Sequence, residues 1–153
     1  MFTYYIVIIA AALATAALGA RFAQSGKSWS RTIRVPDWTP AGRTIAIVWA
    51  ILYGMSALSA IFAFSAGGGG RPDMLAALFV VHALLNVSWC FLFFIQKQIG
   101  SAALECSLVA LCVVMLAISV FPLSVFGALL LVPYLAWSLY AMALTYAIFR
   151  LNV

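Results

Sequence analysis

Five continuous apolar stretches, each about twenty residues long, fill almost the whole of this 153-residue chain. A hydrocarbon core about 30 Å thick is crossed by about 20 helical residues, so each stretch is long enough to span a membrane. Lipid offers no partner for backbone N–H and C=O groups, and the alternating pattern of a membrane β-barrel is absent. The sequence therefore predicts an all-α integral membrane protein, a five-transmembrane-helix bundle. The predicted helices cover residues 4–22, 44–65, 74–95, 100–121 and 125–149.

Composition agrees with this class, because 67% of the residues are hydrophobic and only 7% are charged. Soluble globular domains carry far more charge. The five spans leave no room for a separate soluble domain, so we predict a single membrane domain over residues 1–153. The first span ends in Ala-Leu-Gly-Ala20, which resembles a signal-peptide cleavage site, but no basic region precedes it. We therefore expect the first helix to be retained.

The basic residues are distributed unevenly between the two sides of the predicted spans. Only Arg71 falls on one side. The other seven fall on the opposite side: Arg21, Lys27, Arg31, Arg34, Arg43, Lys97 and Arg150. Cytoplasmic loops carry the excess of Lys and Arg, so the N-terminus is predicted outside, with loop 25–42 and the C-terminus cytoplasmic. We expect the protein to lie in the inner membrane of a bacterium. The net charge of +5 indicates topology and attraction to anionic lipid, not nucleic-acid binding, which needs a broad basic surface.

Loop 25–42 is the longest connection between the predicted spans. Loops of that length in compact domains are usually functional or disordered. This one holds Trp29 and Trp38 together with Pro36 and Pro40, and such residues argue against disorder. We interpret the loop as a lid over the cytoplasmic end of the bundle.

Aromatic and polar side chains recur at helical spacing inside three of the spans, so that those of each span share one face. At a rise of 1.5 Å per residue, Trp49 lies about 9 Å from Arg43 and Trp137 about 20 Å from Arg150. These depths can be reached from the long loop. The residues are Trp49 and Tyr53 in the second span, His82, Asn86 and Trp89 in the third, and Tyr134, Trp137 and Tyr140 in the fifth.

This convergence predicts one aromatic cavity that opens toward the cytoplasmic side under the loop. Flat apolar ligands bind well between aromatic faces, while a few polar groups fix their orientation. Asn86 can both donate and accept a hydrogen bond, and the tryptophan N–H groups can donate. The alternative interpretation is aromatic packing with polar groups satisfied inside the protein.

Two titratable residues inside the spans have a functional and a structural interpretation. A neutral His82 imidazole has the chemistry to ligate a haem iron, although a histidine bonded to a neighbouring helix is the commoner arrangement. Glu105 is the only carboxylate within a span, and intramembrane carboxylates are costly and often functional. In the structural interpretation, Glu105 lies near the membrane interface and either pairs with a basic residue or stays protonated.

The sequence contains no Ser-His-Asp set, paired carboxylates, phosphate-binding loop or metal cluster. Hydrolysis and phosphoryl transfer are therefore disfavoured, and no metal site is predicted. Cys90, Cys106 and Cys112 lack zinc-ligand spacing, and we interpret them as small packing residues.

The motifs together resemble the TspO/MBR family, also called the tryptophan-rich sensory protein, translocator protein or peripheral benzodiazepine receptor family. The loop is similar to its W-x6-P-x-W-x-P signature, and the second span to its V-W-x-x-L-Y run. The matching residues are Trp29, Pro36, Trp38 and Pro40 in the loop, Val48, Trp49, Leu52 and Tyr53 in the second span, Asn86 and Trp89 in the third, and Val132, Pro133, Tyr134 and Trp137 in the fifth.

This resemblance implies a five-helix fold that is often dimeric and needs no obligatory cofactor. The implied ligands are porphyrins and haem, benzodiazepine-type drugs, and cholesterol in animal members. The implied pocket residues are Trp38, Pro40, Trp49, Asn86, Trp137 and Ala141. Some bacterial members are reported to promote light-dependent porphyrin breakdown, which would give Trp49 and Trp137 a catalytic role.

The end of the fifth span also fits a proposed cholesterol-contact pattern through Leu144, Tyr146 and Arg150. That pattern is weak and matches many sequences. A lipid-facing tyrosine beside an arginine that extends to the interface explains it equally well. A sterol or another membrane lipid is thus an expected partner.

The function expected from the sequence is a membrane receptor or sensor that binds a tetrapyrrole or a similar flat hydrophobic molecule. Three alternatives remain open at this point: a transporter of a tetrapyrrole or a sterol, a light-dependent porphyrin-degrading enzyme, and a membrane protein with only a structural or partner-binding role.

Overall fold

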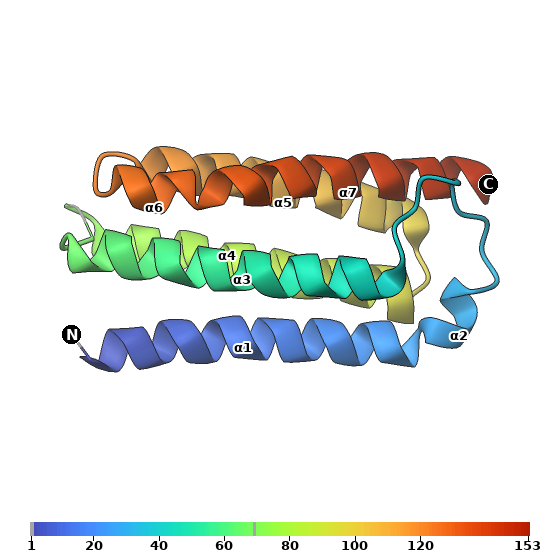
Figure 1. Cartoon of the computed structure of the whole chain (residues 1–153), viewed down its shortest axis with the longest axis horizontal. Coiled ribbons are helices and arrows are strands. Elements are labelled where there is room, and N and C mark those ends of the chain that lie inside the picture. The colour runs from blue at the N-terminus through green and yellow to red at the C-terminus, as the bar shows by residue number, and fades with distance from the viewer. Residues whose placement is uncertain (1, 69) are drawn as a thin grey trace.

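The computed structural model describes residues 2–68 and 70–153, and all regular elements in these ranges are helical. Five apolar helical segments are long enough to cross a membrane, and they run side by side along the long axis of the molecule (Figure 1). The five-helix membrane fold predicted from the sequence is confirmed. The five segments are Tyr5–Ser25, Gly42–Ser65, Pro72–Ile95, Ile99–Val120 and Val125–Leu151.

The helix ends lie within a few residues of the predicted ones. Two of the segments are divided: the third begins as α4 and ends in a π-helical turn, and the fifth consists of α6 and α7. A short helix, α2, lies within the predicted loop. The elements are α1 (Phe2–Ser25), α2 (Lys27–Ser30), α3 (Gly42–Ser65), α4 (Pro72–Cys90), the π-helical turn η1 (Phe91–Ile95), α5 (Ile99–Val120), α6 (Val125–Leu129) and α7 (Leu131–Leu151).

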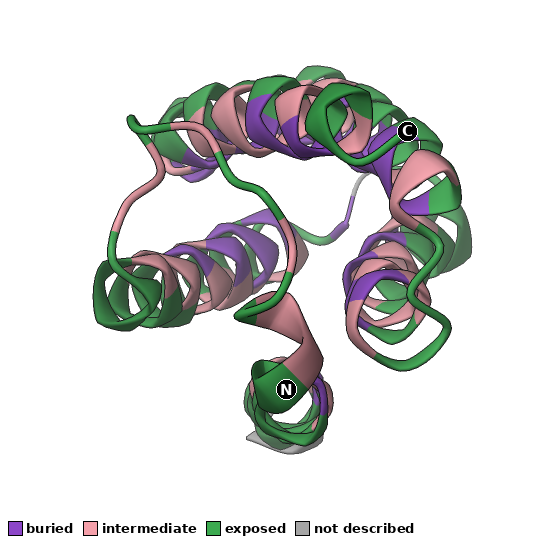
Figure 2. Cartoon of the chain, turned by 90° about the vertical axis from the view of Figure 1, so that its right-hand side faces the viewer, coloured by how far each residue is buried: buried purple, intermediate pink, exposed green. Residues whose placement is uncertain are grey.

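The helices form a ring in which α1 contacts α3 and α4, α3 contacts α6 and α7, and α5 lies between α4 and α7. Figure 2 shows the buried residues on the inner faces of the helices and the exposed residues on the outer faces, as expected for a bundle surrounded by lipid. The main core cluster joins α3, α4, α5, α6 and α7 and includes the fully buried side chains Leu116, Leu131 and Tyr134.

Two glycines allow α1 and α2 to lie close to the third segment. A Cβ atom at Gly19 would lie 3.3 Å from the Sγ of Cys90, and one at Gly26 would lie 2.6 Å from the backbone oxygen of Phe94. Gly26 therefore has no room for a side chain, and the turn that leads into the loop is held against η1.

The interruptions in the third and fifth segments have local causes. In η1, the N–H of Gln96 donates to the oxygen of Phe91, five residues back, and the chain then turns through Lys97 with φ +58°. In the fifth segment, Pro133 lacks the N–H that would bond to Leu129, so the helix breaks at Leu130. The predicted single helix 125–149 is thus two helices.

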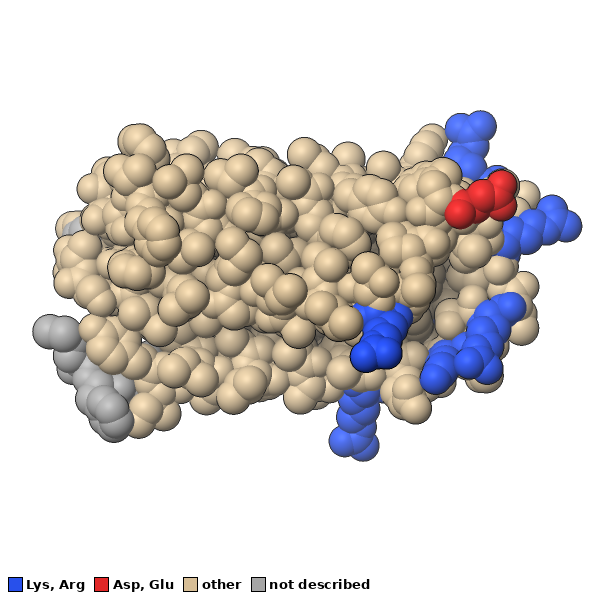
Figure 3. Space-filling view, in the orientation of Figure 1, with Lys and Arg blue, Asp and Glu red and all other residues tan. Residues whose placement is uncertain are grey.

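On the face shown in Figure 3, the charged side chains gather at the end that carries the C-terminus and the loop between α2 and α3. Arg71 and Asp73 lie at the opposite end, at the start of α4. The unequal distribution of basic residues predicted from the sequence is therefore present in the fold. Which side of a membrane this end faces stays a prediction from the positive-inside rule.

Candidate functional site

The aromatic cluster lies among α3, α4 and α7 and consists of Trp49, Tyr53, His82, Tyr134, Trp137 and Tyr140. Trp49 is at its centre. Its ring centroid lies 5.7 Å from that of Tyr53, 5.8 Å from that of Tyr134 and 6.5 Å from that of Trp137. Side chains from separate helices thus meet inside the bundle, as the helical spacing predicted.

A chain of two hydrogen bonds, which we call the polar thread, runs through this cluster and connects α4 to α7. The hydroxyl of Tyr134 donates to Oδ1 of Asn86 at 2.8 Å, and Nδ2 of Asn86 donates to the backbone oxygen of His82 at 2.7 Å. The rings of His82 and Tyr134 lie 4.7 Å apart. All three side chains are buried, so the Asn86 amide is held in one orientation.

Two buried polar atoms of the cluster have no hydrogen-bond partner among the described residues. They are Nε2 of His82 and the indole Nε1 of Trp137. Buried polar groups in proteins nearly always have a partner, and an orphaned one is costly. Ser59 on α3 is fully buried and its hydroxyl is also unpartnered. Sequence reasoning missed Ser59, although a hydroxyl in an apolar span that also carries Tyr53 was a usable signal.

The loop between α2 and α3 crosses the end of the bundle in front of the ring of helices (Figure 2). It is joined to Tyr140 of α7 and to Asn152, the residue that follows α7. The hydroxyl of Tyr140 donates to the backbone oxygen of Trp38 at 3.1 Å. Asn152 accepts from the N–H of Arg34 at 2.9 Å and donates to its oxygen at 2.8 Å. The loop is therefore an ordered cover attached to α7.

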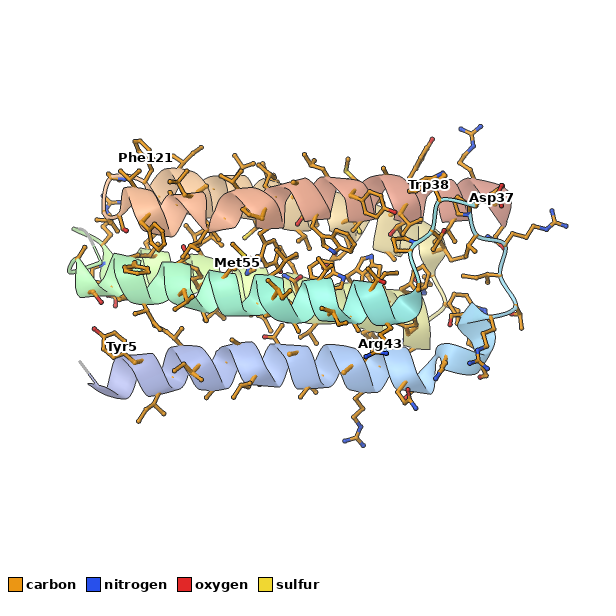
Figure 4. The ribbon with its side chains drawn as sticks, viewed as in Figure 1. Tyr5, Asp37, Trp38, Arg43, Met55 and Phe121 are labelled. Atoms are coloured by element: carbon orange, nitrogen blue, oxygen red, sulfur yellow. The ribbon has the colours of Figure 1, made fainter. Side chains whose placement is uncertain are left out.

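A continuous series of ring contacts leads from this cover into the cluster. Trp38 meets Tyr140 edge to face at 5.6 Å, and Tyr140 stacks on Trp137 at 5.1 Å. Trp137 in turn contacts Trp49. Trp38 lies beside the last turns of α7 (Figure 4) and is 51% exposed. One end of the series is thus at the surface and the other is inside the bundle.

The rings of the cluster are in direct contact in this state, so the open aromatic cavity predicted from the sequence is not formed among them. Trp49 and Trp137 are inclined at 83° with centroids 6.5 Å apart. A flat ligand sandwiched between two aromatic faces needs them parallel and about 7 Å apart, twice a carbon contact of about 3.5 Å. At least one of these indoles must therefore rotate before a ligand can lie between them.

Comparison with known proteins decides the family. A family model described as the TspO/MBR family matches residues 6–151. The chain belongs to the TspO/MBR family. It is 33% identical to the tryptophan-rich protein TspO of Bacillus cereus over 126 residues, which cover 82% of each chain. It is 30% identical to the translocator protein of Sus scrofa, over 83% of this chain and 76% of that protein. It is 28% identical to the protein CrtK of Rhodobacter capsulatus, over 99% and 92% of the two chains.

Other residues singled out in this TspO/MBR chain lie outside the aromatic cluster. Trp89 stacks on Phe93 at 5.3 Å and meets Phe94 edge to face at 6.0 Å. Trp29 of α2 also contacts Phe93, at 5.6 Å. We call these four residues the Trp29–Trp89 cluster. Asn86 and Trp89 share a helix face, but their side chains belong to different groups.

Two residues taken from the family pattern, Pro40 and Ala141, are half-buried. Pro40 ends the cover just before α3, and Ala141 follows Tyr140 on α7. The oxygen of Ala141 accepts a bond from the Thr145 hydroxyl at 2.8 Å. Their positions are next to the cluster and its cover, and contact with a ligand stays a prediction.

The three residues of the sterol pattern of this TspO/MBR chain do not share one surface. Leu144 is buried in the core, whereas Tyr146 and Arg150 are exposed on the outside of α7. The Arg150 guanidinium donates to the Tyr146 hydroxyl at 3.4 Å. Sterol contact therefore stays a prediction that involves at most the outer two residues.

Glu105 has a different partner from the basic residue considered from sequence. The hydroxyl of Ser88 on α4 donates to its carboxylate. Both side chains are half-buried at the contact between α4 and α5. The polar partner comes from the neighbouring helix, which spacing along one helix does not reveal.

Proposed function

We propose that this TspO/MBR chain is a membrane receptor or sensor for a flat hydrophobic ligand of the porphyrin or haem type. The ligand would occupy the aromatic cluster beneath the loop between α2 and α3. One observation carries the proposal: the buried, unpartnered N–H of Trp137 lies among aromatic rings from three helices and under an ordered cover.

The chemistry of the cluster suits such a ligand. Trp49 and Trp137 offer aromatic faces to a macrocycle once one indole has rotated. The N–H of Trp137 can donate to a carboxylate or carbonyl of the ligand, and Nε2 of His82 can accept from or donate to a polar group. Asn86 supports the site indirectly, because it fixes the position of Tyr134.

Entry of the ligand requires the cover to move. The bond between Tyr140 and Trp38 and the paired bonds between Asn152 and Arg34 hold the cover to α7. Breaking the first of these also frees Tyr140, which stacks on Trp137. Opening of the cover and rotation of Trp137 would therefore be coupled, which is how a bound ligand could be signalled at the surface.

Light-dependent breakdown of bound porphyrin is a second candidate function. It is favoured by the ring series Trp49, Trp137, Tyr140 and Trp38, because tryptophan and tyrosine can give an electron to an excited porphyrin, which passes it to dissolved dioxygen, the oxidant that the breakdown would consume. Neighbouring centroids in the series are 6.5, 5.1 and 5.6 Å apart. Illumination of the complex distinguishes the two functions: a receptor returns intact porphyrin, whereas an enzyme consumes it and loses this activity in Trp49→Phe.

The receptor proposal is tested by titrating purified protein with protoporphyrin and following the porphyrin absorbance. Trp137→Phe removes the unpartnered N–H, and we expect a Kd about tenfold higher, as for one lost hydrogen bond to a charged group. Trp29→Phe is the matched control, since Trp29 lies in the other cluster. Equal affinity of Trp137→Phe and wild type would refute the site.

A further inference from the structure

A surface groove of about 640 Å³ lies on the outer side of the cover, between the loop and the last two turns of α7. It is separate from the aromatic cluster, although Trp38, which lines the groove, also contacts Tyr140 of that cluster. Its apolar walls are strongly exposed, because Val35 is 45%, Trp38 51%, Tyr146 52% and Leu151 43% accessible. Large apolar side chains open to the surroundings at the charged end of a membrane helix are typical of the interfacial region.

Two opposite charges stand among these apolar walls. Asp37 comes from the loop and Arg150 from α7, and both line the groove. Asp37 lies beside the last turn of α7 (Figure 4). Within the described part of the chain neither forms an ion pair. Arg150 reaches only the Tyr146 hydroxyl, at 3.4 Å. The groove therefore presents one free anion and one free cation beside a phenol.

The outer face of α7 continues the groove toward the centre of the membrane. Its exposed residues follow one another at alternating steps of four and three, which is a straight apolar stripe on a helix. From the groove inward this stripe consists of Tyr146, Ala143, Leu139, Ala136 and Val132. An acyl chain that starts in the groove can lie along it.

We propose that this groove binds the headgroup of a phospholipid that carries both a phosphate and a primary ammonium, that is, of the phosphatidylethanolamine type. Arg150 and the Tyr146 hydroxyl donate to the phosphate, and the ammonium donates to Asp37. A sterol has a single hydroxyl and would leave both charges unpaired. An anionic headgroup without an amine would meet repulsion from Asp37.

Trp38 connects this lipid site to the cover. The same side chain lines the groove and rests on Tyr140, which bonds to its backbone oxygen at 3.1 Å. A headgroup held between Asp37 and Arg150 joins the loop to α7 and so stabilises the closed cover. Binding of the lipid does not depend on the proposed receptor function. Only the effect of the lipid on exchange of a porphyrin-type ligand rests on that proposed function.

The test is native mass spectrometry of the full chain in detergent, with equal amounts of phosphatidylethanolamine and phosphatidylglycerol. We expect wild type to retain the former about tenfold better, the size of one charge-assisted contact. Arg150→Gln lowers retention of both lipids, whereas Arg150→Lys keeps most of it. Asp37→Asn lowers retention of phosphatidylethanolamine and removes the preference. Arg71→Gln, at the opposite end of the bundle, is the matched control and changes neither.

Three results would overturn the proposal. The first is equal retention of the two lipids by wild type, which would remove the role of Asp37. The second is unchanged retention by Arg150→Gln. The third is displacement of phosphatidylethanolamine by cholesterol, which would give the groove to a sterol. None of these readings involves porphyrin, so they do not depend on the outcome of the receptor test.

Discussion

The two tryptophan-containing clusters of this protein are built from similar rings but differ in their polar surroundings. In the Trp29–Trp89 cluster the tryptophans pack against Phe93 and Phe94, which carry no polar atoms. One indole N–H in each cluster, that of Trp89 and that of Trp137, is buried without a hydrogen-bond partner among the described residues. Only the aromatic cluster adds tyrosine hydroxyls and the Asn86 amide, contributed by α4 and α7. Tryptophan content therefore does not locate the site. Buried polar groups from separate helices do.

The largest effect that tests this comparison is expected from Trp89→Ala. Loss of a partly buried indole should lower the free energy of unfolding by about 3 kcal/mol. Affinity for protoporphyrin should stay within about twofold of wild type, because Trp89 belongs to the packing cluster. Thermal denaturation in detergent and porphyrin titration measure the two quantities. A large loss of affinity in a folded variant would merge the two clusters into one site.

Asn86→Leu should lower both the free energy of unfolding and the affinity for protoporphyrin, because it removes the acceptor of the buried Tyr134 hydroxyl. The loss of this interhelical hydrogen bond should cost about 1.5 kcal/mol of stability. Tyr134 is then free to move into the space of Trp49, and porphyrin affinity should fall at least about tenfold. Tyr134→Phe, which removes the donor of the same hydrogen bond, is the companion variant and should lose a similar amount of stability. Full affinity in Asn86→Leu would contradict the role of the polar thread.

Tyr140→Phe changes the cover and leaves the stacking on Trp137 in place. The variant loses the bond to the oxygen of Trp38, worth about 1 kcal/mol. Bound porphyrin should therefore dissociate about fivefold faster, as measured by transfer to an acceptor protein. An unchanged dissociation rate would show that the loop does not control exit.

The smallest effect is expected from Glu105→Gln, which lies outside both clusters. Glutamine keeps an oxygen that can accept the bond from Ser88. Stability should change by less than about 0.5 kcal/mol, and porphyrin affinity should not change. A clear loss of binding would place the α4–α5 contact within the ligand site.

The membrane spans were predictable because lipid imposes both a length and a helical backbone on any spanning segment. The predicted 44–65 and 100–121 lie within two residues of Gly42–Ser65 and Ile99–Val120. The π-helical turn Phe91–Ile95 was not predictable, since a wholly apolar segment has no periodicity that could reveal it. The break at Leu130 had a signal in Pro133, but the two pieces stay aligned within one span.

For the candidate site, helical spacing was sufficient to bring Trp49, Tyr134 and Trp137 together. Helical spacing also grouped Trp89 with Asn86, and this grouping was wrong. Two residues can share a helix face while their long side chains contact different neighbours. Spacing also gave no indication that Asn152 bonds to Arg34, which is 118 residues earlier in the chain. Such a pair depends on where the loop and the end of α7 lie relative to each other in the folded protein, which the local sequence does not contain.

The central claim is tested most directly by the indole N–H signals in a ¹⁵N NMR spectrum of the protein in micelles. The chain has five tryptophans, so each group is observed separately. Protoporphyrin should shift the signals of Trp49 and Trp137, and that of Trp38 more weakly, and leave Trp29 and Trp89 in place. Shifts confined to Trp29 and Trp89 would show that the ligand binds elsewhere and would contradict the account.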